Sequence, residues 1–260
     1  MTETCKACHD PLIISLDPED LDNGENQPQT VPDDLLLPCG CHFHWQCLLD
    51  ESSTIVSTLS CPSCNTYLSS NAAGASSSSS SSAPAPADPV ILTHYTNEGG
   101  VDPSLDIYPS LAEEAYLTAH PEARPARAFH TLVSEGEVQG MVELLADVDG
   151  NEEAPLSAAQ LLAWRDPLNG GRSALHVALE ARQEEAVWLL LWLGSRARRE
   201  DFPEAVVQVA AANGLPRRLE GVEDGEDVRF VKDERGRTAG DVCLELGEPW
   251  TKLVEGGLFS

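Results

Sequence analysis

Eleven consecutive residues, LPCGCHFHWQC (residues 37 to 47), contain three cysteines and two histidines. Thiolate and imidazole are side chains that bind Zn²⁺ readily, and a structural zinc ion takes four such ligands. Seven of the eight cysteines in the chain lie within the first 64 residues. This density predicts a metal-binding module at the N-terminus.

The candidate ligands fall into four pairs along the chain. Three pairs have two intervening residues, a spacing at which a tight turn lets both members reach one ion, and the fourth has one. Four pairs match two four-coordinate zinc ions. A disulfide cluster is the alternative, and it is disfavoured because the N-terminus has no secretory signal. The candidate ligands are Cys5, Cys8, Cys39, Cys41, His44, Cys47, Cys61 and Cys64.

A low-complexity tract separates this module from the rest of the chain. Residues 69 to 89 consist almost entirely of Ser, Ala and Pro, with no apolar periodicity from which a core could form. We predict a small α+β zinc-stabilised module at residues 1 to 68, a disordered linker at residues 69 to 105, and a mostly α-helical domain at residues 106 to 260.

The charge of the chain disfavours one class of partner. It has 43 acidic and 16 basic residues, a net charge of −27, so binding to a nucleic-acid backbone would be electrostatically costly. The longest apolar run, residues 186 to 194, is about half of the roughly 20 residues that span a membrane. We therefore expect neither nucleic acid nor membrane as a partner, and an intracellular location in the cytoplasm or nucleus.

The ligand spacing and the phrases LPCG, FHWQCL and CPSC resemble the RING finger family. In that family two zinc sites alternate along the chain, so the resemblance implies one site with Cys5, Cys8, His44 and Cys47. It implies a second site with Cys39, Cys41, Cys61 and Cys64. The family phrase has a histidine at the position of Cys41. Here His42 occupies the variable place that follows it, so the resemblance predicts that His42 is not a ligand.

RING fingers commonly act as ubiquitin ligases that hold a charged ubiquitin-conjugating enzyme without covalent chemistry of their own. The residues that the resemblance assigns to docking are Ala7, Leu48 and Pro62. Ala7 is smaller than the residue that is usual there, and Asn65 stands where active members often have an arginine.

Helix starts are legible in the C-terminal part. Ser110 with Glu113, Ser157 with Gln160, and Asp201 with Glu204 have the spacing of a capping box. Convincing strand patterns are few, so we expect a mostly helical domain.

The same part resembles the ankyrin repeat. The stretch from residue 166, DPLNGGRSALHVALEARQEEAVWLLLWLGS, contains a Gly-rich turn, a short helix pattern and a second helix pattern. Equivalent positions begin at Ser173, Ala205 and Thr238, at a period close to the 33 residues of that family. A weaker copy begins at Arg127, with an insertion near residues 147 to 160. The resemblance implies a solenoid in which His176 makes structural hydrogen bonds.

Two functions fit these observations. The first is a RING-type ubiquitin ligase whose zinc module, with two structural zinc ions, recruits a ubiquitin-conjugating enzyme while the ankyrin-like repeats bind a protein substrate. The alternative is a non-catalytic zinc-binding adaptor, which Ala7 and Asn65 favour. We find no Gly-x-Ser-x-Gly elbow, phosphate-binding loop or His-Glu-x-x-His motif that would indicate another enzyme. We expect Trp188, Trp192 and Cys243 to pack inside the helical domain.

Overall fold

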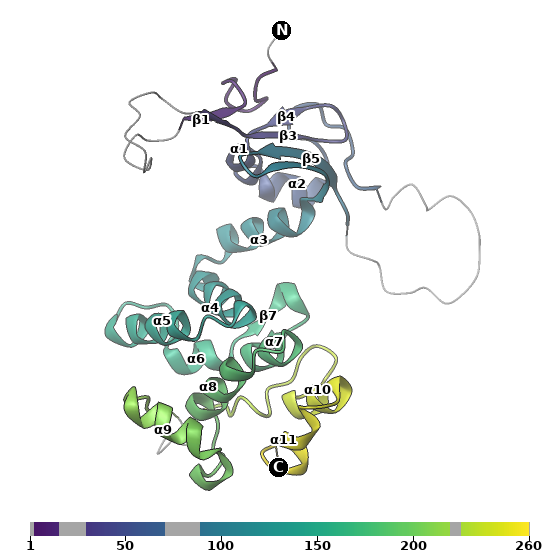
Figure 1. The fold of residues 1–260 in the computed structure, drawn as a ribbon. Coiled ribbons are helices and arrows are strands. Elements are labelled where there is room, and N and C mark those ends of the chain that lie inside the picture. The colour runs from purple at the N-terminus through teal and green to yellow at the C-terminus, as the bar shows by residue number, and fades with distance from the viewer. Residues whose placement is uncertain (1–2, 16–29, 71–88, 219–224, 260) are drawn as a thin grey trace, which may run out of the picture. The chain divides into compact units, whose positions relative to one another are not determined.

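The computed structural model describes residues 3–15, 30–70, 89–218 and 225–259. The chain divides into two compact units, Met1–Ala119 and His120–Ser260. The first is small, with cysteine clusters and short sheets, and the second is largely helical (Figure 1). This coarse organisation was expected from the sequence.

A four-stranded antiparallel sheet with order β4-β3-β5-β6 forms the centre of the N-terminal unit. Leu35 pairs with Phe43 on one side and with Tyr95 on the other. Leu35 and Phe43 are buried, and they pack with Leu48 and Ile55 from the helices. The elements are β1 (Ile13–Ser15), β2 (Thr30–Pro32), β3 (Asp34–Leu36), β4 (His42–Phe43), α1 (Trp45–Leu49), α2 (Ser52–Thr58), β5 (Leu92–Asn97), β6 (Gly100–Asp106) and α3 (Tyr108–Ala119).

The boundary between the two units differs from the predicted one. Residues 71–88 of the predicted linker lie outside the described residues, but residues 92–106 form a β hairpin whose first strand pairs with β3. Helix α3 then packs against α1 and α2, which places Ile107 and Leu111 in the N-terminal core. The reason is that β3 has an open edge after pairing with β4, and β5 covers it.

Three helix pairs stack in the described part of the C-terminal unit: α4 with α5, α7 with α8, and α10 with α11. The first helices of the pairs are adjacent, because α7 packs against both α4 and α10. Helix α8 packs against α5, α6, α7 and α9, which explains why it is apolar around most of its circumference. The elements are α4 (Arg124–Glu135), α5 (Val138–Gly150), α6 (Ala158–Ala163), β7 (Arg165–Asp166), β8 (Arg172–Ser173), α7 (Ala174–Glu180), α8 (Glu184–Gly194), α9 (Glu204–Ala212), α10 (Ala239–Leu246) and α11 (Thr251–Glu255), with 3₁₀ turns at Pro121–Ala123, Pro167–Asn169 and Arg199–Asp201.

A turn that starts at Asp166 and a turn that starts at Asp233 contact each other between the second helix pair and the third. The amide of Glu234 donates to the Gly170 carbonyl at 3.0 Å, and His176 Nε2 lies 3.0 Å from the Arg237 carbonyl. The other ring nitrogen of His176 lies 2.7 Å from the Ser173 hydroxyl, so its predicted structural role is confirmed. Gly171 has φ +68°, and a Cβ there would lie 3.1 Å from the Glu234 amide nitrogen. This close approach of the turns requires glycine.

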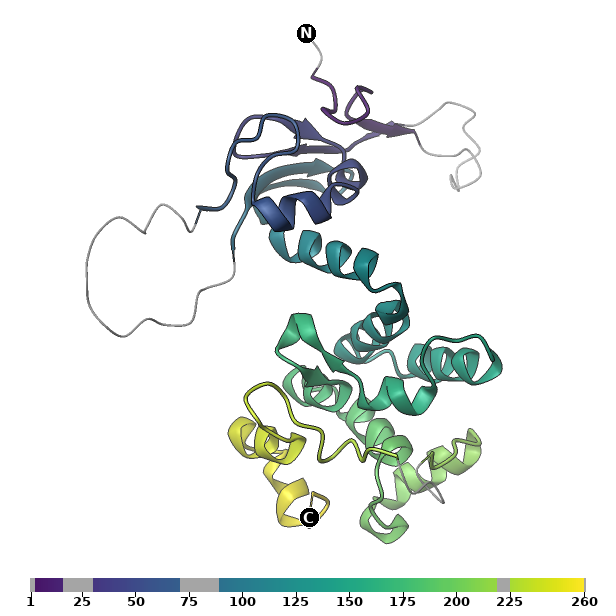
Figure 2. The same cartoon turned by 180° about the vertical axis from the view of Figure 1, so that it is seen from behind.

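The predicted copy at Ala205 does not form a helix pair of its own. It lies in the single helix α9, which packs against α8. The helix that packs against α7 after α4 is α10 and not α9. In Figure 2, viewed from behind, α9 (light green) and α10 (yellow) belong to different parts of the helical unit. The 33-residue period therefore predicts one stacked helix pair too many, because it counts the inserted helix α9 as a repeat.

The aromatic and thiol residues of this unit pack as expected. Trp192 is 6% exposed and Cys243 is fully buried, while Trp188 is half-buried. Both tryptophan rings lie beside Phe202, with ring centroids 6.3 Å from it for Trp188 and 5.3 Å for Trp192. Of the helices in the described ranges, none has the length and apolar character needed to cross a membrane.

Candidate metal centre

The first cluster of possible ligands comes from two separate parts of the chain. Cys5 and Cys8 lie in the turn that precedes β1, while His44 is the residue before the first residue of α1 and Cys47 lies within that helix. The four donor atoms all lie within 4.8 Å of one another. His44 Nδ1 is 3.3 Å from Cys8 Sγ and 3.7 Å from Cys47 Sγ. The four residues are therefore brought together as the resemblance implies.

The second cluster alternates with the first along the sequence. Cys39 and Cys41 lie in the turn between β3 and β4, and Cys61 and Cys64 lie in the turn that follows α2. Their sulfur atoms also lie within 4.8 Å of one another. Each cluster thus joins an early turn to a late one, and an ion in either cluster would cross-link segments that are distant in the sequence.

The turns that carry Cys5 with Cys8 and Cys61 with Cys64 have matching backbone geometry. His9 donates its amide to the Cys5 carbonyl and Asn65 donates its amide to the Cys61 carbonyl, at 3.0 and 2.9 Å. Both residues have left-handed backbone angles, with φ 68° at His9 and 57° at Asn65. The turn between β3 and β4 differs, because its left-handed residue, Gly40 (φ 82°), lies between the two cysteines and donates its amide to the Leu37 carbonyl at 2.9 Å.

His44 is oriented by a hydrogen bond away from the cluster. Its Nε2 lies 2.9 Å from the Pro11 carbonyl oxygen, which can only accept a hydrogen bond. The proton is therefore on Nε2, and Nδ1 presents its lone pair to the cysteines. Metal-ligating histidines are commonly fixed by this kind of outer hydrogen bond.

The thiols of each cluster compete for protons. Burial, together with neighbouring thiols, raises the pKa of Cys39 and of Cys47 to about 12. Hydrogen bonds from Thr66, whose hydroxyl lies 3.2 Å from Cys64 Sγ, lower the pKa of Cys64 to about 6. Burial alone would raise the pKa of Cys5, but backbone amides lower it to about 7. A divalent cation would relieve this competition by stabilising all the thiolates together.

These donor sets fit zinc. Ligands at Zn–S distances of about 2.3 Å and Zn–N distances of about 2.0 Å lie roughly 3.5–3.8 Å apart in a tetrahedron, close to the separations around His44. Two cysteine-rich clusters could each hold a metal ion. Each offers four protein ligands, which leaves no position for a reactive water, so such a metal would be structural rather than catalytic.

His42 belongs to neither cluster. Its Nδ1 lies 2.7 Å from Asp34 and its Nε2 lies 3.1 Å from Glu3, so the ring bridges two carboxylates. These three residues also group closely enough to be considered as metal ligands. However, each carboxylate lies at hydrogen-bond distance from a different nitrogen of the ring, so hydrogen bonds account for the group without an ion. We interpret the group as a hydrogen-bonded bridge that ties the N-terminal residues to β3.

The three docking residues suggested by the RING resemblance differ in exposure. Ala7 is exposed and Pro62 is half-buried, both on cysteine-bearing turns. Leu48 is fully buried in the core of the unit. A side chain without exposed surface offers no contact area to a partner, so the assignment of Leu48 to a docking surface is corrected. Leu48 instead extends from α1 into this core.

Three residues that hold the site together were not identified from the sequence. The buried carboxylate of Asp33 accepts from the Trp45 amide at 3.2 Å and from the Tyr95 hydroxyl at 3.0 Å. The rings of Trp45 and Tyr95 lie 5.1 Å apart. Asp33 thus caps the helix that carries Cys47. No short-range pattern could have indicated this, because Tyr95 is 62 residues from Asp33.

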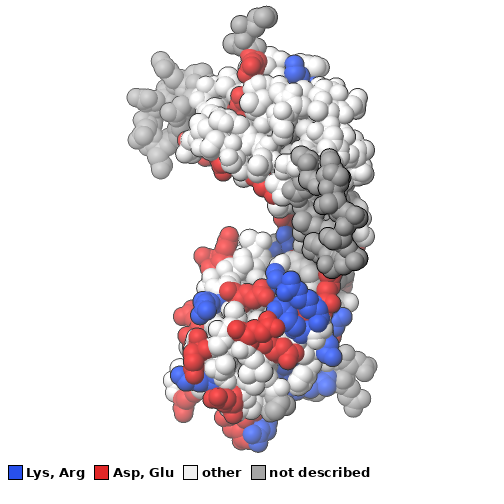
Figure 3. All heavy atoms as spheres, turned by 90° about the vertical axis from the view of Figure 1, so that its right-hand side faces the viewer, with Lys and Arg blue, Asp and Glu red and all other residues white. Residues whose placement is uncertain are grey.

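The surface of the helical unit carries both signs of charge. Figure 3 shows Lys and Arg interspersed with Asp and Glu on the face drawn. Ion pairs account for part of this pattern, including Arg172 with Glu180 at 3.2 Å and Arg237 with Glu245 at 2.6 Å.

Comparison of the chain with family models, with curated proteins and with solved structures gives no match.

Proposed function

We propose that the chain is a RING-type ubiquitin ligase. In this proposal the two clusters bind structural zinc ions, the N-terminal unit recruits a ubiquitin-conjugating enzyme, and the helical unit, as an ankyrin-like repeat domain, binds a protein substrate. The proposal includes an intracellular location, in the cytoplasm or nucleus, because zinc binding needs reduced thiols.

The observation that supports this proposal best is the alternating order of the two clusters. Four pairs of ligands could be divided between two ions in several ways, and the close groups join the first pair to the third and the second pair to the fourth. That order is the one that the RING resemblance implies. It also leaves Ala7 and Pro62, on turns of different clusters, with exposed surface for a partner.

Ubiquitin transfer by the purified protein tests the proposal. The protein would be incubated with ubiquitin, activating enzyme and a panel of conjugating enzymes, and self-modification would be followed. Ala7→Asp should reduce transfer at least ten-fold, because it places a charge on an apolar contact, while both zinc ions stay bound. Ala119→Asp, the same change at an exposed position on α3, is the matched control. Equal loss in both variants, or no loss in Ala7→Asp, would reject this docking surface.

A gain-of-function variant strengthens the test. Ala7→Ile adds apolar surface that could contribute about 1–2 kcal/mol to docking, roughly a ten-fold gain in affinity. Asn65→Arg is less informative, because the left-handed backbone at Asn65 favours asparagine and an arginine there would be strained.

The small side chain of Ala7 and the uncharged Asn65 favour a second candidate. In this alternative the zinc module and the helical unit are both protein-binding surfaces of a non-catalytic adaptor. Absence of transfer by the wild type and by Ala7→Ile, with every conjugating enzyme and with both zinc ions present, would favour the adaptor.

A further inference from the structure

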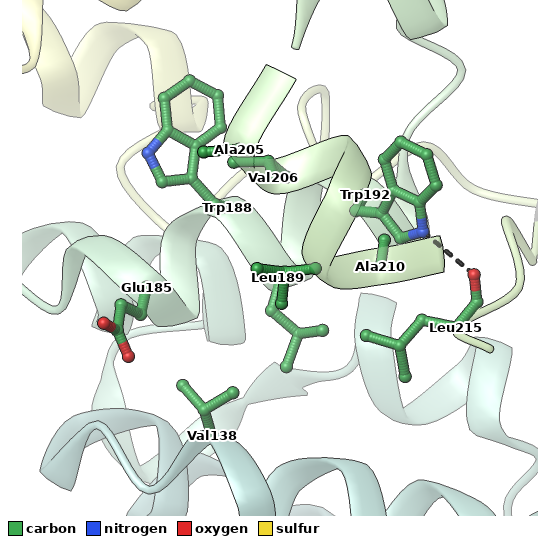
Figure 4. A pocket seen from close by; sticks show the side chains of 10 residues that line it. Val138, Glu185, Trp188, Leu189, Trp192, Ala205, Val206, Ala210 and Leu215 are labelled. Carbon is green, nitrogen blue, oxygen red and sulfur yellow. Dashed lines mark hydrogen bonds between the residues drawn. The ribbon is translucent and has the colours of Figure 1, made fainter. Parts of the chain in front are cut away.

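An apolar cavity of about 280 Å³ lies within the helical unit, between α5, α8 and α9. Trp188 and Trp192, one helical turn apart on α8, flank it, and Leu189 lies between them (Figure 4). Val138 lines it from the start of α5, and Val206 from the start of α9. Helix α9 thus forms one wall of a cavity that the stacked helix pairs alone would not enclose.

The lining of the cavity suits an apolar side chain better than a free small molecule. Pockets for small molecules range from about 300 to 1,000 Å³ and usually contain several polar groups that orient the ligand. This cavity lies just below that range, and Glu185 is the one charged group among the described residues that line it. The indole nitrogen of Trp192 is already used, since it donates to the Leu215 carbonyl at 3.1 Å.

The rim of the cavity is acidic. Three helices begin beside it, and exposed carboxylates stand at their first residues: Glu137 before α5, Glu184 and Glu185 in α8, and Glu204 in α9. Each helix N-terminus offsets about half an elementary charge, which leaves the rim negative overall. No Lys or Arg is among the described residues that line this cavity. The guanidinium of Arg217 lies 5.4 Å from the centre of the Trp192 ring, so the negative charge is confined to the end of the cavity near Trp188.

We propose that this cavity binds a bulky apolar side chain from a basic segment of a partner protein. The side chain enters between Trp188 and Trp192, and Lys or Arg residues next to it in the partner pair with the rim carboxylates at the Trp188 end. An apolar anchor with flanking cations matches both the lining and the charge. This inference rests on the proposed function, because it identifies the class of substrate that the helical unit would hold.

Selection from a random twelve-residue peptide library displayed on phage tests the inference with the full zinc-loaded chain. Enriched peptides should contain one Leu, Ile, Met, Phe or Trp with at least two Lys or Arg residues close to it. Synthetic copies, measured by fluorescence anisotropy, should bind more weakly as the salt concentration rises, because screening reduces the attraction to the rim.

Matched variants locate the binding site. Ala205→Arg places a large cation at the cavity wall and should weaken peptide binding at least ten-fold. Ala212→Arg makes the same change at an exposed position on α9 that does not line the cavity, and should have no effect. Glu185→Lys should weaken binding several-fold, whereas Glu255→Lys, an equal change in net charge on α11, should not.

Three outcomes would overturn the inference: no enriched peptides, enriched peptides without basic residues, or binding that is insensitive to Ala205→Arg. Because this assay contains no ubiquitin or conjugating enzyme, its failure leaves the ligase test unaffected. Conversely, peptide binding without ubiquitin transfer would support the cavity as a peptide-binding site and reject only the ligase proposal.

Discussion

The Tyr95 hydroxyl donates a hydrogen bond of 3.0 Å to the buried carboxylate of Asp33, from a strand on the far side of the low-complexity tract. Asp33 also holds the amide of Trp45 at the start of α1. The hairpin formed by β5 and β6 is therefore part of the structure that positions the ligands on α1.

Tyr95→Phe should destabilise the N-terminal unit by about 1–3 kcal/mol, because it leaves a buried acceptor short of one hydrogen bond. The zinc content at neutral pH should not change. Zinc release during urea unfolding, followed with a chromophoric dye, reports on this unit. Tyr67→Phe is the control, since Tyr67 is 49% exposed. An equal effect of both substitutions would contradict the role of the Asp33 contact.

The division of the chain predicts how fragments behave. Residues 120 to 260 should keep their helical circular dichroism in the presence of a chelator, because no residue of either cluster lies in that unit. Residues 1 to 119 should lose their structure on chelation. A shorter fragment, residues 1 to 68, should unfold in less urea than residues 1 to 119 even with zinc, since it lacks β5, β6 and α3. Equal midpoints for the two fragments would place the boundary earlier.

The choice between Cys41 and His42 as a ligand is testable by metal analysis. The wild type should contain two zinc ions per chain. Cys41→Ser should lose one of them, whereas His42→Ala should retain both, because the ring nitrogens of His42 contact the carboxylates of Glu3 and Asp34 and His42 is in neither cluster. If His42→Ala released metal and Cys41→Ser did not, the ligand assignment would be wrong.

His130 should make the helical unit sensitive to acid. It is 4% exposed, neither ring nitrogen has a hydrogen-bond partner among the described residues, and burial lowers its pKa to about 3. The His130 ring takes up a proton near pH 6.5 in the unfolded chain but not in the folded chain. Its contribution to the free energy of unfolding is therefore fully present above pH 6.5. It falls as the pH drops toward 3, by up to about 1.4 kcal/mol per pH unit.

The substitution His130→Leu tests this in the fragment of residues 120 to 260. It should raise stability at pH 7 by about 1–3 kcal/mol by removing unpaired polar atoms, and it should reduce the loss of stability between pH 6.5 and 4. His120→Leu, at a side chain that is 50% exposed, should change neither. Urea unfolding at several pH values measures both effects, and an unchanged pH dependence in His130→Leu would contradict the assignment.

The residues that could bind metal were predictable from the sequence because that chemistry is local. Residue type limits the possible ligands, and a turn of two intervening residues is enough to bring both members of a pair to one ion. The capping box of Ser157 with Gln160 is equally local and is confirmed. Ser110 with Glu113 has the same spacing but lies inside α3, so spacing alone was misleading there.

Other features depended on which surfaces needed to be covered, and only the tertiary structure decided them. The open edge of β3 takes β5 as its partner, which moves the boundary of the N-terminal unit to residue 119. Helix α7 packs against α10 rather than against the helix at the expected period. The burial of Leu48 and the cavity beside Trp188 have the same origin. Each depends on contacts between residues far apart in the chain. The free energy of such contacts comes from the apolar surface that both partners bury together. A short stretch of sequence contains only one of the two partners, so it cannot indicate the contact.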